Sequence, residues 1–439
     1  MQSCVSIRRS QVRESGNSRR LHVPFARRQF QFPAGAAAGN TIDAAFAARR
    51  TESVAESVLA ISQPKADDPH IDAPYLDGAG PGGASGVRII MGWRAAPGRF
   101  AEDLPVPAPP LYPLRFTPSY QYRLWGGRRL EKIFGVTLPG HAPIGEAWLL
   151  SDRADHSSLV ANGALKGQTL TQVLGQWPDD FLGANLRHAS RFPLLLKFLD
   201  VQGVLSVQVH PSDEQVAYHP AGETGKTEAW VVLLNGPQGL IYAGLRPQTT
   251  SGALERAISD GRVAECLESF TPDAGDGVFV PAGTVHSLRD VVVFEVQENS
   301  DVTYRLYDWK QVDPVTHEPR PLQVREAMAC IDYSRGAVAP VIPVMEEAGP
   351  ASRERLFDCK QFTLWRLQSS VAFTVGKMDT PRVLVCIAGA GSLRHHGIDY
   401  ACSVGEVLLL PAVVGACMCR PVDSIALLEI ALPDGDAKS

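Results

Sequence analysis

The sequence feature that most constrains the fold is a short β-like run that carries two metal-binding residue types. Residues 204–210 are rich in apolar and β-branched side chains, which indicates a strand. Because side chains alternate across a strand with a period of two, Gln208 and His210 lie on one face. The run therefore predicts both a strand and one side of a metal site.

A second β-like run returns soon afterwards. Residues 227–234 again read as a strand, and the same alternation puts Lys226 and Glu228 on one face, where an amine and a carboxylate would lie beside the imidazole. Between the two runs, Ser212 followed by Gln215 has the spacing of a helix N-terminus, so we expect a short helix to cross there.

A matching motif lies downstream. Gly275, Pro281, Gly283 and His286 follow the spacing G-x5-P-x-G-x2-H, with Asp290 at the position where an Asn usually closes the motif. This spacing resembles the second motif of the cupin barrels. It implies that His286 faces the same site as the two upstream runs.

The first cupin motif is normally H-x-H followed by a Glu, and in this chain a glutamine takes the place of the first histidine. The resemblance implies four metal ligands, which are Gln208, His210, Glu228 and His286. Two imidazole nitrogens, one carboxylate and one amide oxygen suit zinc, although iron, cobalt or manganese could occupy the same set. Only one of these ligands carries charge, so a bound divalent ion stays electrophilic.

Longer strings make the resemblance more specific. KTEAW, which contains Lys226 and Glu228, occurs together with QENSDVTYRLYDW, with IGEAWLLSD at 144–152 and with FPLLLKFLDVQGVLSVQVHP at 192–211. With the glutamine of the first motif, these strings resemble the type I mannose-6-phosphate isomerases, in their short bacterial form. The resemblance covers most of the range from 113 to about 333.

The resemblance implies a mainly β protein, in which a catalytic cupin (jelly-roll) barrel with a small helical insert precedes a second, metal-free cupin-like lobe. It also implies one Zn2+ per chain and the reversible isomerisation of mannose 6-phosphate and fructose 6-phosphate through an enediol. The expected partner is a small sugar phosphate, the expected location is the cytoplasm, and the expected state is a monomer or a homodimer.

The run 294–307 alternates polar residues at odd positions with mostly apolar residues at even positions. The pattern alone fits a surface strand and a cavity-lining strand equally well. The resemblance favours the cavity, because Asp301 and Arg305 match the S-D-x-x-x-R element of the family's catalytic centre. Arg305 would hold a developing oxyanion and Lys226 would be the base and proton shuttle, with Asp301 and Glu295 as rival bases.

A substrate phosphate needs cationic or backbone donors. Arg128 and Arg129, which follow the Trp-Gly-Gly element at 125–127, and Lys310 are the candidates, although solvated charge is the simpler interpretation of the arginine pair. Lys197 lies in the apolar string LLLKFLD, where an unpaired charge would be costly. We therefore expect Lys197 to face a polar interior or a partner carboxylate.

The first part of the chain differs from the rest. Residues 1–110 show no sustained apolar period, and residues 1–50 contain nine arginines and only two acidic residues. We expect a disordered extension or an over-extended start there, with Met91 as a candidate true start. Nothing catalytic should depend on residues 1–105.

The remaining chain is expected to divide in two. Residues 111–335 would form the catalytic cupin domain, with the helical insert at about 165–190, and residues 336–439 the C-terminal lobe. In that lobe the string GEVLLLPAVVGA mimics the second cupin motif but has Val413 for its Gly and Ala416 for its His. A metal-free lobe follows from these two replacements.

Composition excludes some functions and leaves others. A net charge of -5 without a basic stripe gives no reason to expect nucleic acid or an anionic membrane surface, and eight scattered cysteines without a C-x2-C pair fit free thiols. Two alternatives to an isomerase stay open. One is a metal-dependent cupin oxygenase, against which the glutamine ligand argues, and the other is a non-catalytic cupin that binds a sugar phosphate.

Overall fold

The computed structural model describes residues 111–184, 186 and 189–432, and all that follows refers to this part of the chain. The predicted extension at 1–110 lies outside the described residues, as do positions 185, 187 and 188 of the expected helical insert. No helix of the described part is long and apolar enough to cross a membrane.

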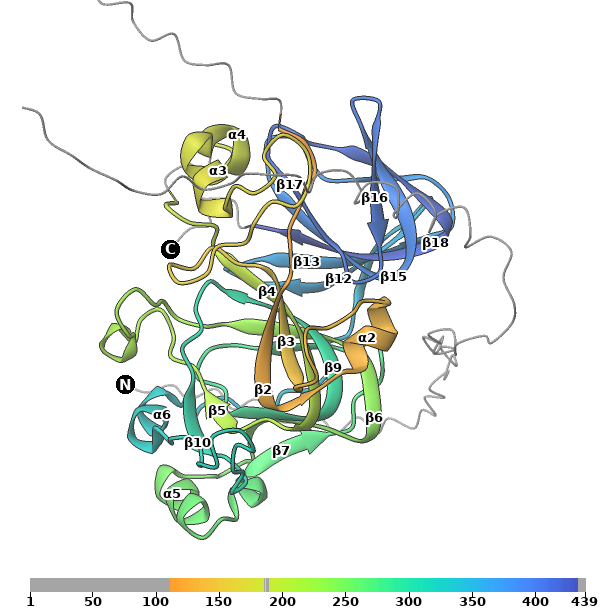
Figure 1. Cartoon of the computed structure of the whole chain (residues 1–439). Coiled ribbons are helices and arrows are strands. Elements are labelled where there is room, and N and C mark those ends of the chain that lie inside the picture. Colours follow the sequence, from red (N-terminus) through yellow and green to blue (C-terminus); the bar gives the residue numbers. More distant parts are fainter. Residues whose placement is uncertain (1–110, 185, 187–188, 433–439) are drawn as a thin grey trace, which may run out of the picture. The chain divides into compact units, whose positions relative to one another are not determined.

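Antiparallel strands dominate the structure (Figure 1). The first sheet contains β2 (Ser119–Gly127), β3 (Ile144–Leu150), β4 (Leu194–Val204), β5 (Val207–Val209), β6 (Glu228–Leu245), β7 (Leu267–Phe270), β8 (Gly277–Val280), β9 (His286–Glu298) and β10 (Tyr304–Tyr307). Its pairing order is β10-β5-β9-β4-β2-β3, and β6 pairs with β7, β8 and β9.

A second sheet contains most of the C-terminal strands. Its members are β1 (Leu114–Arg115), β11 (Val344–Ala348), β12 (Ser352–Asp358), β13 (Thr363–Ser369), β14 (Phe373–Val375), β15 (Arg382–His395), β16 (Ile398–Ser403), β17 (Val407–Leu410) and β18 (Cys417–Ala431). Because β1 pairs with β17, the first described strand belongs to this sheet. The prediction of a mainly β protein is confirmed, whereas the division at 335/336 stays a prediction.

The helices are short. They are α2 (Arg129–Phe134), α3 (Leu170–Gln176), α4 (Pro178–Leu182), α5 (Ser251–Ser259) and α6 (Val324–Cys330), with 3-10 turns η1 (Val216–Tyr218) and η2 (Val263–Cys266). A reciprocal capping box between Thr169 and Gln172 starts α3, and Pro178 starts α4, where its missing N–H costs no helical hydrogen bond. Short helices thus occur where the helical insert is expected.

Two apolar clusters hold the strands that carry the site. One contains Trp230 of β6 and Val293 of β9, and the other contains Val207 and Val209 of β5. Because Val207 and Val209 are buried in their cluster, the alternation of the strand turns Gln208 to the opposite face.

The expected strand at 204–210 is interrupted. β4 ends at Val204 and β5 begins only at Val207, because side chains from a later loop bond the carbonyls at the break: Gln311 Nε2 donates to Val204 O and Trp309 Nε1 to Leu205 O. β5 then pairs with β10, and pairs with β9 only through Gln208 and His286.

Two further sequence expectations need correction. The helix expected after Ser212 is only the single 3-10 turn η1, although Gln215 does accept a hydrogen bond from the Ser212 N–H. The run 294–307 is not one strand. It leaves the sheet after Glu298 and re-forms as β10, because β9 pairs with β4 and β6 while β10 pairs with β5.

Candidate active site

Three buried donor residues converge at the ends of three strands. His210 follows β5, Glu228 begins β6 and His286 begins β9, and their donor atoms all lie within 4.8 Å of one another. His210 Nε2 is 3.4 Å from Glu228 Oε2, and His286 Nε2 is 3.1 Å from Glu228 Oε1. His210 Nε2 and both Glu228 oxygens are buried and form no hydrogen bond to any described residue. Lys226 forms an ion pair with Glu228 Oε2, but the clustering of these unbonded donor atoms indicates a further shared partner, and a divalent metal ion fits.

Hydrogen bonds on the far side of each ring orient the two histidines. His210 Nδ1 donates to Val302 O at 2.7 Å, and His286 Nδ1 donates to Thr284 O at 2.9 Å. Because Nδ1 carries the proton, Nε2 of each neutral ring keeps its lone pair for a ligand. Burial lowers the pKa of His210 to about 3 and also lowers the pKa of His286, so both rings are neutral at physiological pH.

Gln208 lies next to the three donor residues but turns its amide nitrogen, and not its amide oxygen, toward them. Its Nε2 is 3.2 Å from His286 Nε2, and its Oε1 accepts a hydrogen bond from Ser206 Oγ. A half-turn of the amide would exchange the two atoms and bring the oxygen to the site. The role of Gln208 as a fourth ligand stays a prediction.

A polar cavity of about 490 Å³ lies beside the donor group. Gln208 and all four candidate catalytic residues, which are Lys226, Glu295, Asp301 and Arg305, contribute to its lining. The structure therefore brings together the residues that the sequence nominated as metal ligands and catalytic groups, with the three buried donors next to Gln208 and Lys226. Lys226 Nζ is 3.1 Å from Glu228 Oε2 and links the cavity to the donor group.

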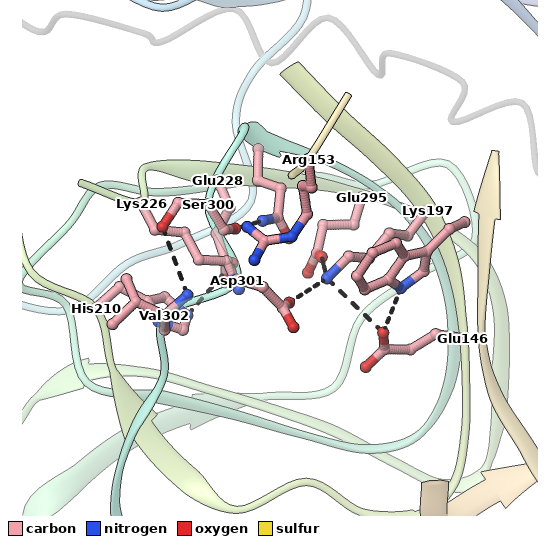
Figure 2. A network of polar contacts seen from close by, with 12 residues as sticks. Glu146, Arg153, Lys197, His210, Lys226, Glu228, Glu295, Ser300, Asp301 and Val302 are labelled. Carbon is pink, nitrogen blue, oxygen red and sulfur yellow. Dashed lines mark hydrogen bonds and ion pairs between the residues drawn. The ribbon is translucent and has the colours of Figure 1, made fainter. Parts of the chain in front are cut away.

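Lys197, in the middle of β4, organises the carboxylates of the cavity (Figure 2). Its Nζ donates to Asp301 Oδ1 at 3.0 Å and lies 3.8 Å from both Glu146 Oε2 and Glu295 Oε1. Burial alone would lower the pKa of Lys197, but the three carboxylates raise it above its usual range. The expectation that Lys197 faces a carboxylate in a polar interior is confirmed.

The two rival bases differ in their electrostatic surroundings. Burial and the charge of Glu228 raise the pKa of Glu295 to about 7, and its carboxylate accepts a hydrogen bond from Trp230 Nε1 at 3.0 Å. Burial works in the same direction at Asp301, but Lys197 and Lys226 outweigh it and lower the pKa of Asp301. Glu295 can therefore exchange a proton near neutral pH, whereas Asp301 stays ionised.

Arg305 supplies a cation to the cavity. It lies opposite Gln208 in the register between β10 and β5. Burial lowers the pKa of Arg305, and its Nε is buried without a hydrogen bond to any described residue. Arg320, also in the lining, is instead paired with Asp308, to which its Nε donates at 2.8 Å. Arg305 is thus better placed than Arg320 to take up a new anionic partner.

The phosphate donors expected from the sequence do not line this cavity. Arg128 donates to Glu131, and Arg129 donates to Asp200 and Asp290, so both guanidinium groups are already paired with carboxylates of the protein. The expectation for Arg128, Arg129 and Lys310 is therefore not supported. Arg123 and Arg320 line the cavity instead, and both were missed. Arg123 lies two residues before the Trp-Gly-Gly element, but the sequence alone does not show which face of that strand points into the cavity.

The chain is similar to proteins of one known family. Residues 113–226 match the family model "Phosphomannose isomerase type I, catalytic domain". The probable mannose-6-phosphate isomerase GmuF of Bacillus subtilis is 33% identical over 307 residues, which cover 69% of this chain and 95% of that protein. The mannose-6-phosphate isomerase of Streptococcus mutans is 31% identical over 304 residues, covering 69% of this chain and 93% of that protein.

Solved structures show the same fold. The crystal structure of the mannose 6-phosphate isomerase from Bacillus subtilis superimposes with a TM-score of 0.67 at 27% identity, covering 72% of this chain and 99% of that one. A zinc-bound mannose 6-phosphate isomerase superimposes with a TM-score of 0.59 at 16% identity, covering 73% and 99% of the two chains. At this identity the second likeness concerns the fold alone.

Proposed function

The chain belongs to the type I mannose-6-phosphate isomerases and is an isomerase, and on this premise we propose that it interconverts mannose 6-phosphate and fructose 6-phosphate through an enediol. Moving a carbonyl between C1 and C2 requires a group that takes and returns a proton, and a group that holds negative charge developing on oxygen. The observation that carries the proposal is one cavity that contains Lys226, Glu295 and Arg305, whose Nε has no hydrogen bond to any described residue, beside three convergent buried donors.

We assign one zinc ion to His210, Glu228 and His286, with Gln208 as the fourth ligand. The donor chemistry and the orphaned buried atoms support this assignment, and a zinc-bound mannose 6-phosphate isomerase shares the fold. When bound, zinc supplies Lewis-acid polarisation of a substrate oxygen.

Lys226 is the proposed base that removes the proton from one carbon and returns it to the next. It combines contact with Glu228 and access to the cavity. Glu295 is the second proton carrier, because its pKa of about 7 lets it hold or release a proton at neutral pH. Asp301 is assigned to orienting Lys197 instead, since a carboxylate with a lowered pKa is a weak base.

Arg305 is the proposed holder of the oxygen that becomes negative. Its Nε is buried and forms no hydrogen bond to any described residue, so this donor is already desolvated and little reorganisation is needed when charge appears. Arg320 is close enough to lower the pKa of Arg305, so a substrate anion between the two would also relieve their repulsion.

Turnover and deuterium incorporation at C2, measured with bound zinc as a control, test these roles. Arg305→Ala should lower kcat by about 100-fold or more, the scale of a lost oxyanion donor, without changing zinc content. Lys226→Met should lower kcat and suppress incorporation, since a placed proton-transfer group contributes about 100-fold or more. Near-normal turnover in both variants would remove the assignments.

Binding of mannose 6-phosphate by the wild type without deuterium incorporation would favour a non-catalytic sugar-phosphate-binding protein, and oxygen uptake would favour an oxygenase.

A further inference from the structure

The segment 299–303, between β9 and β10, makes two contacts with the site. The Asp301 carboxylate accepts from Lys197 Nζ at 3.0 Å, and the Val302 carbonyl accepts from His210 Nδ1 at 2.7 Å. Since the segment has left the sheet, ladder hydrogen bonds do not fix its position. Something else must hold these two acceptors in place.

Contacts from two other loops hold the segment. Glu223 Oε2 accepts from the Asp301 backbone N–H at 3.0 Å, and Ser300 Oγ donates to Thr224 O at 3.0 Å. Asn299 Nδ2 donates to Asp152 O, also at 3.0 Å. The carboxylate of Glu223 is therefore a direct support of the peptide that leads into Asp301.

Arg153, just beyond β3, fixes that carboxylate. Its Nη1 and Nη2 donate to Glu223 Oε2 and Oε1 at 3.0 and 2.6 Å, a two-bond fork in which the side chains are only 12% and 14% exposed. Neither residue lines the cavity. Glu223 also lies three residues before Lys226 in the chain, so the Arg153–Glu223 pair restrains the loop that carries the proposed base.

We propose that Arg153 and Glu223 are positioning residues of the isomerase, which act through the peptide of Asp301 on Lys197 and His210, and through the loop 223–226 on Lys226. The inference rests on the proposed function, because it assigns a task to groups that the reaction uses. Loss of the fork lets the segment 299–303 drift, so the acceptors for Lys197 and His210 are misplaced while the cavity keeps its lining residues. The chemical step should therefore suffer more than substrate binding.

The test compares Arg153→Met with Arg353→Met. Arg353 makes a similarly part-buried ion pair, at 2.7 Å with Glu429, in the second sheet and away from the cavity. Arg153→Met should lower kcat by about 10-fold or more, the scale seen for outer partners of metal-site residues, with KM little changed. Arg153→Lys, which keeps the charge without the planar fork, should recover only part of the loss. Arg353→Met should lower stability but leave kcat unchanged.

Two further measurements keep the inference open to refutation. Glu223→Gln keeps the size of the side chain and is expected to lower kcat as much as Arg153→Met. It provides the test if Arg153→Met does not fold. Amide hydrogen exchange at 299–303, which does not depend on turnover, should accelerate in either variant. Wild-type kcat in folded Arg153→Met or Glu223→Gln overturns the inference, as does unchanged exchange. A wild type without isomerase activity would refute the proposed function, and the exchange result alone would then decide the positioning role.

Discussion

Replacing Lys197 with methionine should expose the electrostatic balance on which the cavity depends. The side chain is 2% exposed and its Nζ lies 3.0 Å from Asp301 and 3.8 Å from Glu146 and Glu295. Methionine fills nearly the same space without charge, so packing is kept and only the cation is lost. Arg123 still pairs with Glu146 at 2.8 Å, but Asp301 and Glu295 then lose their ion pairs with Lys197.

The expected cost follows from the burial of the cluster. Removing one partner of a buried ion pair costs about 3–5 kcal/mol, and the 34% exposure of the Asp301 side chain puts this case near about 3 kcal/mol. In the wild type, Asp301 has a lowered pKa, so its contribution to stability is present above its unfolded pKa and lost as pH falls through the folded value. The variant lacks this contribution. The difference from wild type should therefore be largest near pH 8 and shrink as pH falls below about 4, the unfolded pKa of an Asp.

Urea unfolding at several pH values measures the difference, with bound metal determined in parallel. Lys360→Met is the matched control, because Lys360 is 71% exposed and its 3.5 Å contact with Asp213 should be worth less than about 1 kcal/mol. A loss at Lys197 no larger than that of the control, or one that does not change with pH, would refute the view that the three carboxylates share this cation.

The remaining predictions concern the metal and the N-terminal part of the chain. His286→Ala should reduce the zinc content measured by elemental analysis, since it deletes one of three convergent donors, and a variant that retains stoichiometric zinc would contradict the ligand assignment. A chain that begins at Met91 should keep the full isomerase rate, because 69% of this chain suffices to match 95% of the length of the Bacillus subtilis relative GmuF. Loss of activity in soluble, shortened protein would show that the extension is required.

Part of the donor set could be predicted from short-range alternation, whereas the ligand roles and the inclusion of His286 came from the resemblance to the cupin motifs. One strand period relates Gln208 to His210, and another relates Lys226 to Glu228. Each relation needs only a local extended backbone, which the apolar and β-branched neighbours favour. The same alternation predicted the polar positions of 294–307, but only the resemblance favoured the cavity over the surface, and Glu295, Asp301 and Arg305 do line the cavity.

Pairings between distant segments could not be predicted in this way. The carboxylate that accepts from Lys197 lies 104 positions away, and the partner of Arg153 lies 70 positions away. Local patterns carry no information on such contacts. Arg129 is an example. Its position after the Trp-Gly-Gly element suggested either a phosphate donor or a solvated charge, but its guanidinium donates a hydrogen bond to Asp200 of β4.

Breaks in the strands were missed because they are set by side chains from elsewhere. The side chains of Trp309 and Gln311 donate hydrogen bonds to the carbonyls of Leu205 and Val204, and no feature of the run 204–210 itself predicts these bonds. The break has a consequence for the site. Only after the chain has left β4 can β5 pair with β10 and set Gln208 opposite both Arg305 and His286.

A last prediction concerns Glu298, at the end of β9. Its backbone N–H donates to Thr227 O, and its carboxylate accepts from the Thr227 N–H. Thr227 lies between Lys226, the proposed base, and Glu228, a donor residue. Burial and the nearby charge of Asp213 raise the pKa of Glu298 to about 7. Because the pKa of Glu298 is higher in the folded state, its contribution to the free energy of unfolding is complete below the pKa of the unfolded chain, near 4.5. This contribution is lost as pH rises through the folded pKa of about 7. At about 1.4 kcal/mol per pKa unit the loss is on the order of 3 kcal/mol.

Glu298→Gln mimics the protonated carboxyl at every pH, since its amide oxygen can still accept from the Thr227 N–H. The variant should match the wild type near pH 4.5 and become more stable than it as pH rises to 8, with the urea midpoint as the measurement. Glu255→Gln, on the exposed face of α5, serves as the control and should follow the wild type throughout. Parallel curves for Glu298→Gln and wild type would mean that Glu298 is already ionised at no cost to the folded state, and that Asp213 does not oppose its charge.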